Sequence, residues 1–383
     1  MKALEFYSGI GGLHLALKRS EADATVVRAF DWDLAACEVY EANFGAGIAA
    51  KTDISTLTAD TLAPLDASLW LLSPACQPYT VLNPHAKGAL DPRAKSFLHL
   101  VQDVLPELAK RGAHPTHLLV ENVAGFETST TRTILVSTLQ DLGYTTREFL
   151  LTPLQFGIPN SRLRYYLLAK RAPYSFRLDE VGAGSASGPG PLRYIPGSGS
   201  QPWVDNRLQT TAGADAVPNI MEVDEIQTYL DAEPDAACAI PDKVLNKWGR
   251  LFDIVLPSAR RSCCFTRGYT QLVERAGSVL QMNEELDTTT VFDTFLVQKT
   301  IDDNAVRLLD PLRLRYFSPN ELLRLFAFNS PLDTPAAPPT RAYVWPASTS
   351  RKTKYRLIGN SVNVRVVEEL VRYLMAEPGA ESA

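Results

Sequence analysis

The first 170 residues alternate short apolar runs with stretches of helical spacing, a pattern typical of a parallel sheet with helices on both faces. The expected strands are residues 4–7, 25–30, 69–72, 117–121, 146–151 and 165–169. The expected helices are residues 12–19, 33–43, 96–108 and 132–142. We therefore predict one doubly wound, Rossmann-like α/β domain over residues 1–175.

Composition divides the rest of the chain. Residues 181–213 are rich in Gly, Ser and Pro and cannot bury enough apolar surface to stay rigid, so we predict a flexible linker over 176–214. Residues 215–310 have mixed patterning and form a predicted second, smaller domain. Residues 311–383 are predicted to return to the first domain through a Pro-rich loop at 330–346 and a final helix at 364–375.

Net charge, cysteine spacing and the lack of a long apolar segment argue against several classes of protein. A net charge of -5 argues against broad, nonspecific adhesion to nucleic acid, because phosphate neutralisation needs clustered Lys and Arg. Five scattered cysteines lack the paired spacing of a zinc site or disulfide framework, so we expect reduced thiols and no metal. Without a signal-like or membrane-spanning segment, we expect an intracellular, cytoplasmic protein that also enters the nucleus.

The segment after the first expected strand contains the pattern Gly9-x-Gly11-Gly12, which is shorter than the GxGxxG pattern of dinucleotide-binding loops. Its glycines let a ligand approach the backbone. Asp31 follows about twenty residues later, at a strand end where a carboxylate can bind ribose hydroxyls. Trp32 offers a flat face for an adenine. The pattern predicts an adenosine-containing cofactor, with a structural turn and NAD binding as the alternatives.

Reactive side chains accompany three other expected strands. Cys76 follows residues 69–72 on a Pro-bounded loop, and Glu121 ends residues 117–121. Arg162 and Arg164 lead into residues 165–169 on one face, by period-two alternation. Because open α/β sheets bind ligands at the carboxyl ends of their strands, we expect these groups to meet there. The alternatives are a small buried hydrophobe for Cys76, a capping role for Glu121 and solvation for the arginines.

Five motifs, in this order, resemble those of the cytosine-C5 methyltransferase family. They are Tyr-Ser-Gly-Ile-Gly-Gly at 7–12, Ala-Cys-Gln at 75–77, Glu-Asn-Val at 121–123, Arg-Leu-Arg at 162–164 and Gly-Asn-Ser-Val at 359–362. The tract Cys-Phe-Thr-Arg-Gly-Tyr at 264–269 is similar to the signature of the type-two DNA-methyltransferase homologues, which methylate cytosine 38 of aspartate tRNA. Two positions depart from the family: Ala75 replaces Pro, and Tyr7 replaces Phe.

The resemblance implies S-adenosylmethionine as cofactor and covalent attack by Cys76 on C6 of cytosine, with Glu121 at N3, Arg164 at O2 and Arg162 supporting the loop. It implies a cofactor site of Tyr7, Gly9, Ile10, Gly11, Gly12, Asp31, Trp32, Asp53, Ile54, Ser73, Asn360 and Val362. Substrate contacts are expected from Cys264, Phe265 and Thr266, with Arg260, Arg261, Arg267 and the basic stretch 351–354 at phosphates.

We expect a monomeric enzyme acting on tRNA, with aspartate tRNA as the best candidate. One alternative is the same chemistry on duplex DNA, which needs a unit able to enter the major groove. The other is a catalytically impaired RNA-binding homologue, marked by Ala75. The intact set of Cys76, Glu121, Arg162 and Arg164 argues against such decay.

Overall fold

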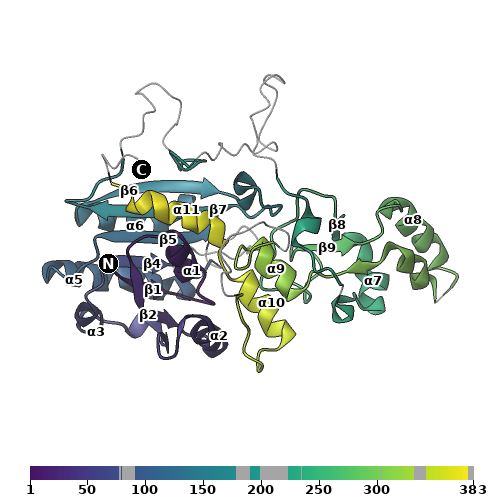
Figure 1. The fold of residues 1–383 in the computed structure, drawn as a ribbon, viewed down its shortest axis with the longest axis horizontal. Helices are drawn as coiled ribbons and strands as arrows, with labels where there is room; N and C mark the ends of the chain where they lie inside the picture. The colour runs from purple at the N-terminus through teal and green to yellow at the C-terminus, as the bar shows by residue number, and fades with distance from the viewer. Residues whose placement is uncertain are drawn as a thin grey trace, which may run out of the picture.

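The computed structural model describes residues 1–76, 79, 91–177, 190–198, 223–233, 235–302, 304–331 and 342–377. A larger unit is built on one broad sheet, and a smaller unit lies beside it (Figure 1). The purple N-terminal segment and the yellow C-terminal helix α11 (Val364–Met375) lie together in the larger unit (Figure 1). The two ends of the chain therefore build one unit, and the middle of the chain builds the other.

Among the described residues, the sheet of the larger unit has the strand order β3-β2-β1-β4-β5-β7-β6. Strand β7 runs antiparallel to both neighbours, and the other pairs are parallel. This order confirms the predicted Rossmann-like α/β class. The strands are β1 Lys2–Phe6, β2 Thr25–Asp31, β3 Ala49–Lys51, β4 Leu69–Leu72, β5 His117–Val123, β6 Tyr144–Leu151 and β7 Arg164–Arg171.

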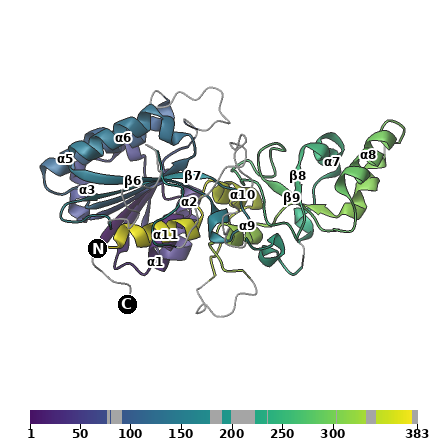
Figure 2. The ribbon, with the colours of Figure 1, turned by 90° about the horizontal axis from the view of Figure 1, so that it is seen from above.

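Helices cover both faces of this sheet (Figure 2). Because both faces are covered, all four residues of strand β4 are buried. Leu69 and Leu71 pack in one apolar cluster, and Trp70 and Leu72 pack in another on the opposite face. The first cluster includes α1 Gly12–Arg19, α2 Leu34–Phe44 and α11 Val364–Met375; the second includes α3 Ala59–Leu62, α4 Lys95–His99, α5 Leu105–Lys110 and α6 Thr130–Asp141.

The strand order reverses between β1 and β4, which lie side by side with Phe6 opposite Leu72. The chain continues from these two strands to opposite sides of the sheet, so their carboxyl ends form a topological switch point, the place where open α/β sheets bind ligands. The segments that carry Gly9 and Cys76 begin at this switch point. The fold therefore places the predicted cofactor loop beside the predicted nucleophile.

Several elements differ from the sequence prediction. Helices α1 and α11 match their predicted bounds, but the helix expected at 96–108 is α4, a π-helical turn η5 (Leu100–Val104) and α5. Strand β3 was not predicted, because three residues without large apolar side chains give no periodic signal. It is followed by a 3-10 turn, η1 (Ile54–Thr56).

The described part of the smaller unit contains a second sheet, ordered β10-β9-β8. Strand β10 lies beyond the boundary predicted at residue 310. Within the predicted linker, Leu192 exchanges 2.8 Å backbone hydrogen bonds with Glu148 and Leu150 of β6, while 178–189 and 199–222 lie outside the described residues. Its elements are α7 Asp242–Trp248, β8 Asp253–Val255, β9 Ser278–Gln281, α8 Thr288–Gln298, η11 Ala305–Leu312 and β10 Leu314–Arg315. Two further helices, α9 Pro319–Leu325 and α10 Arg351–Gly359, lie between this unit and the larger one (Figure 2).

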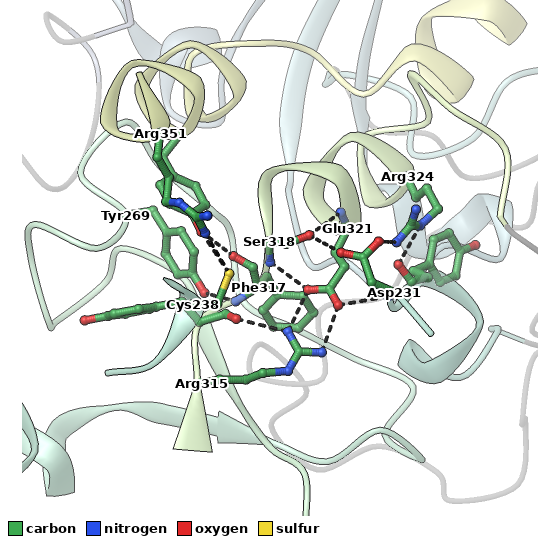
Figure 3. A network of polar contacts seen from close by, with 12 residues as sticks. Asp231, Cys238, Tyr269, Arg315, Phe317, Ser318, Glu321, Arg324 and Arg351 are labelled. Atoms are coloured by element: carbon green, nitrogen blue, oxygen red, sulfur yellow. Dashed lines mark hydrogen bonds and ion pairs between the residues drawn. The ribbon is translucent and has the colours of Figure 1, made fainter. Parts of the chain in front are cut away.

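A buried polar network fixes the smaller unit to helix α9 (Figure 3). Arg315 donates two hydrogen bonds of 2.8 Å to the fully buried carboxylate of Glu321. Ser318 and Arg324 both donate to Asp231, at 2.5 Å. Removing one partner would leave a buried charge unpaired, at a cost of about 3–5 kcal/mol. The network therefore sets the position of the smaller unit against the C-terminal helices.

Candidate active site

Three glycines follow β1 for different steric reasons. Gly11 has a φ of +80°, and a Cβ there would lie 2.3 Å from the Phe44 ring. A Cβ on Gly12 would lie 2.7 Å from Val362. Gly9 has a φ of +52° and open space at the same position. Gly11 and Gly12 thus permit close packing, whereas Gly9 leaves room for a ligand to approach the backbone.

Asp31 ends β2 and turns its carboxylate toward the glycine segment. One oxygen accepts the Gly9 N–H at 2.7 Å, and the other accepts the Asp33 N–H at 2.9 Å. Burial raises the pKa of the Asp31 carboxyl, while these two donors act in the opposite direction. The next residue, Trp32, is 78% exposed. The structure thus brings the predicted ribose acid to the glycine segment and leaves the predicted adenine platform accessible.

Serine and tyrosine side chains complete this edge of the sheet. Ser73 donates to the Tyr7 carbonyl at 2.9 Å, and the Tyr7 hydroxyl donates to Ser96 at 3.0 Å. Ser8 is buried, and its hydroxyl has no hydrogen-bond partner among the described residues. An unpartnered buried hydroxyl beside an open glycine is a position that a polar ligand can satisfy. These residues fit an adenosine-containing cofactor.

The remaining predicted cofactor residues divide by burial. Asp53 is exposed and accepts the Ser55 N–H at 2.9 Å, and Asn360 is exposed at the end of α10. Ile54 is buried, as is Val362 against Gly12. Asp53 and Asn360 are therefore accessible to a ligand, whereas Ile54 and Val362 supply apolar packing.

Cys76 lies on the segment that follows β4 at the switch point. Its residue is exposed. The Pro74 carbonyl accepts a 3.2 Å hydrogen bond from Asn122, which ties this segment to β5. Desolvation by the surrounding protein raises the pKa of the Cys76 thiol, while Arg164 acts in the opposite direction. The site thus presents an accessible thiol that is mostly protonated at neutral pH.

Glu121 projects from β5 as a buried carboxyl, 8% exposed. Arg164 places its Nε 3.5 Å from the Glu121 carboxylate. Burial raises the pKa of Glu121, and the guanidinium groups of Arg164 and Arg162 oppose this rise. Cys76, Glu121 and Arg164 lie close enough for their charges to act on one another. The sequence-predicted reactive groups therefore meet at one edge of the sheet.

Arg162 is buried and supports the site from within the protein. Its guanidinium donates to the carbonyl of Phe265 at 2.9 Å and to that of Ser361 at 2.5 Å. It also lies 4.9 Å from the centre of the Phe326 ring. Arg162 thus joins the tract 264–269 to the C-terminal motif 359–362, over long separations in sequence.

The two arginines converge on Cys264. Its Sγ lies 3.3 Å from Arg162 Nη1 and 3.5 Å from Arg164 Nη2. Burial acts to raise the pKa of the Cys264 thiol, but the two guanidinium groups outweigh it and lower the pKa below its ordinary value. The tract predicted to contact substrate therefore reaches the reacting centre through this sulfur atom.

The structure contradicts the expected substrate contact of Phe265. Its side chain is fully buried, and its ring packs against those of Tyr269 and Phe317 with centroids 5.1 Å apart in each pair. A buried ring presents no surface to a ligand, so Phe265 anchors the tract in the core. A three-residue motif does not reveal burial, because an aromatic residue serves either role.

The backbone of the same tract packs on Gly359 of α10. A Cβ at Gly359 would lie 2.2 Å from the Thr266 carbonyl carbon and 2.4 Å from the Arg267 nitrogen. Real Cβ atoms do not approach backbone this closely, so the contact requires glycine. The motif 359–362 identified this glycine from the sequence, but its close contact with the tract 264–269 could be recognised only in the folded structure.

The predicted phosphate-binding residues fall into two groups. Arg260 and Arg351 are engaged in ion pairs with neighbouring acidic residues, at 2.9 and 2.5 Å. Arg261, Arg267 and Lys352 are exposed and have no ion-pair partner among the described residues. The second group is therefore better placed to contact a polyanion.

Sequence reasoning missed two supports of the glycine segment. The Tyr343 hydroxyl donates to the Ile10 carbonyl, and Ser96 holds Tyr7. Neither residue lies in a recognisable motif, because each acts through a contact that the fold creates. Within the described residues, no group of three or more His, Cys, Asp or Glu could hold a metal, and no helix there is long and apolar enough to cross a bilayer.

The switch point of the sheet, the open glycine segment beside an acid, and the cysteine beside a buried glutamate define a Rossmann-like methyltransferase. The chain belongs to the C-5 cytosine-specific DNA methylase family, whose model matches residues 1–376.

Similar proteins span nearly the whole chain. The tRNA (cytosine(38)-C(5))-methyltransferase of Schizosaccharomyces pombe is 38% identical, covering 98% of this chain and 97% of that protein. The DNA (cytosine-5)-methyltransferase of Dictyostelium discoideum is 35% identical, covering 98% and 94%. The crystal structure of the S. pombe Dnmt2 methyltransferase superposes with a TM-score of 0.73 at 35% identity, covering 98% of each chain.

Proposed function

We propose that this chain methylates C5 of cytosine in tRNA, with S-adenosylmethionine as methyl donor and Cys76 as covalent nucleophile. The observation that carries the proposal is the meeting of Cys76, Glu121 and Arg164 at the switch point, beside the tract 264–269. C5 of cytosine is a poor nucleophile because it belongs to an aromatic ring. An accessible thiol beside a buried carboxyl supplies the covalent catalysis that can activate it.

In this proposal the thiolate of Cys76 forms a bond to C6 of the target cytosine. The π electrons of the C5–C6 bond then shift toward C4 and N3, which leaves an enamine with a nucleophilic C5. After C5 has gained its methyl group, loss of the C5 proton to a base and departure of Cys76 with its bonding pair restore the C5–C6 double bond. Cys76 is regenerated, as covalent catalysis requires.

Glu121 and Arg164 would hold the base during this sequence. A carboxyl whose pKa is raised by burial retains a proton that it can share with N3 as electrons move there. Arg164 would donate to O2 of the base. Cys264 contacts both guanidinium groups through its sulfur, so Cys264 and Arg162 would help to position Arg164.

The cofactor, when bound, supplies an electrophilic methyl group. Asp31 would accept hydrogen bonds from ribose hydroxyls, and Trp32 would stack on the adenine. Gly9 and the unpartnered hydroxyl of Ser8 would face the methionine portion. Asp53 would accept from the adenine amino group.

Three observations support tRNA as the substrate. The tract 264–269 is similar to that of tRNA-methylating homologues, and the S. pombe relative is named for that reaction. Arg267 is exposed within the tract, and Arg261 is exposed just before it. An anticodon loop presents an unstacked cytosine, so the enzyme avoids part of a flipping cost of about a few kcal/mol. Aspartate tRNA methylated at cytosine 38 is our specific proposal, with a monomeric enzyme acting in the cytoplasm and the nucleus.

The second candidate is methylation of duplex DNA, favoured by the name of the D. discoideum relative. The two are separated by methyl incorporation from labelled cofactor into transcribed aspartate tRNA, the same tRNA with cytosine 38 changed to uridine, and a cytosine-rich DNA duplex. We expect labelling of the first substrate alone. Faster labelling of the duplex would favour the DNA reaction, equal labelling of both tRNAs would contradict the target site, and labelling of none would favour an impaired homologue.

A further inference from the structure

His99 has an oxygen acceptor at each of its two ring nitrogens. Nε2 lies 2.7 Å from the Leu57 carbonyl oxygen, and Nδ1 lies 2.9 Å from an Asp103 carboxylate oxygen. A neutral imidazole has one N–H group and would turn a lone pair toward one of these oxygens. The imidazolium donates to both. The surroundings of His99 are therefore those that favour its charged form.

The position of His99 connects it to the proposed cofactor site. His99 and Ser96 lie three residues apart on α4, on one face of the helix. Ser96 accepts from Tyr7 in the segment after β1, and His99 donates to Leu57 at the end of η1. Asp53, proposed to accept from the adenine amino group, caps the start of this turn. One face of α4 thus holds two separate cofactor segments.

We propose that His99 is a positioning residue for the cofactor site: its imidazolium fastens η1 to α4, and cofactor binding weakens as His99 loses its proton. The inference rests on the proposed cofactor site. It adds a residue that lies outside every motif quoted above and that acts through the turn rather than on the cofactor.

The electrostatics around His99 agree with this role. Burial favours the neutral ring, but the hydrogen bonds to Leu57 and Asp103 outweigh it, and the pKa of His99 is raised above its ordinary value. Asp103 is the charge that acts on the ring. Charged groups of the surrounding elements have other contacts: Asp91 with Arg93, Asp60 with Arg111, and Asp53 with Ser55.

The direction of the pH effect follows from the raised pKa. The charged ring is present below the His99 pKa and donates to both oxygens. A neutral ring has one N–H to share between them, so its hold on η1 weakens as pH rises through that value. Cofactor affinity should therefore fall with rising pH. By linkage, a bound cofactor should raise the pKa of His99 by a matching amount.

The test is calorimetric titration of the full chain with S-adenosylhomocysteine, the demethylated form of the proposed cofactor, from about pH 6 to about pH 8.5. We expect Kd to rise about fivefold or more across this range. His99→Gln keeps a donor for Leu57 but cannot titrate, so its Kd should lose this dependence. Asp103→Asn removes the neighbouring charge, so the midpoint should move to lower pH.

A matched control is His114→Gln, which should keep the parent pH profile. His114 precedes the amino end of β5, whereas the switch point lies at the carboxyl ends of the parallel strands. Thermal melts of each variant verify folding. A second readout is the imidazole proton resonance of His99, identified by its loss in His99→Gln, which should titrate at higher pH when S-adenosylhomocysteine is bound.

The outcomes separate two failures. A parent protein that binds no S-adenosylhomocysteine at any pH would contradict the proposed cofactor site. A parent that binds it with a pH-independent Kd would overturn the role of His99 and leave the cofactor site standing. The same conclusion would follow if His99→Gln retained the parent pH dependence, or if the His99 resonance did not respond to the ligand.

Discussion

Arg164 places its Nε 3.5 Å from the carboxylate of the buried Glu121. The pairing limits the rise in the Glu121 pKa that burial alone would cause. The same guanidinium contacts Cys264, so one side chain connects the proposed base-binding carboxyl to the tract 264–269. Arg164 therefore contacts both the carboxylate whose pKa rise it limits and the tract of the smaller unit that reaches the site.

Replacing Glu121 with Gln should slow methyl transfer by about 100-fold or more, because it removes the proton that offsets charge at N3 and keeps the side-chain shape. Single-turnover rates on aspartate tRNA provide the measurement. Affinity for S-adenosylhomocysteine serves as the control and should stay near that of the parent. A variant altered in that affinity alone would show that Glu121 acts on the cofactor and not on the base.

Cys76→Ser should abolish methylation while leaving the fold and cofactor affinity nearly intact, because a hydroxyl is a far weaker nucleophile at neutral pH. A tRNA carrying 5-fluorocytosine at the target position provides a direct test. Its C5 fluorine cannot leave as a proton does, so the parent enzyme should form an adduct that survives denaturing electrophoresis. The covalent role is wrong if Cys76→Ser forms that adduct or turns over within a few-fold of the parent.

The rate of methyl transfer should rise with pH, because the thiolate is the nucleophile and the pKa of Cys76 is raised. Below that pKa the thiolate fraction grows about tenfold per pH unit, so the single-turnover rate should increase steadily between about pH 6.5 and about pH 8.5. Saturating cofactor removes any contribution from binding. A flat profile would mean that another step limits the rate or that substrate lowers the thiol pKa.

The sequence predicted the sheet well because its central strands contain short apolar runs. The four buried residues of β4 are an example, and the groups that follow such strands could be assigned to one edge before the fold was known. Strand β3 was not predicted, because Ala49–Lys51 has no alternation of apolar and polar side chains. The π-helical turn η5 was not predicted either, because no sequence pattern distinguishes it from an α-helix.

Within the site, local pattern identified residue types but not long-range partners. Arg162 and Arg164 were expected together, yet their convergence on Cys264 joins positions about a hundred residues apart. Burial explains the error at Phe265, since an aromatic residue in a motif can face either substrate or core. His99 carries no motif, because its role depends on two oxygens that the fold brings to its ring.

Gly359→Ala should destabilise the protein and slow methylation, although helix propensity alone favours Ala by about 1 kcal/mol. The new Cβ would lie 2.2 Å from the Thr266 backbone, which a rotamer change cannot relieve. Overpacking of this kind costs about 1–3 kcal/mol, and the close approach to backbone places it at the upper end, so we expect a net loss of about 2 kcal/mol in the free energy of unfolding. Because the displaced tract carries Cys264, the rate should fall even at temperatures where the variant is fully folded.

Gly190→Ala is the matched control, since a Cβ there meets open space. Urea unfolding and single-turnover rates of both variants make the comparison, and parent-like values for Gly359→Ala would show that the tract does not depend on this contact.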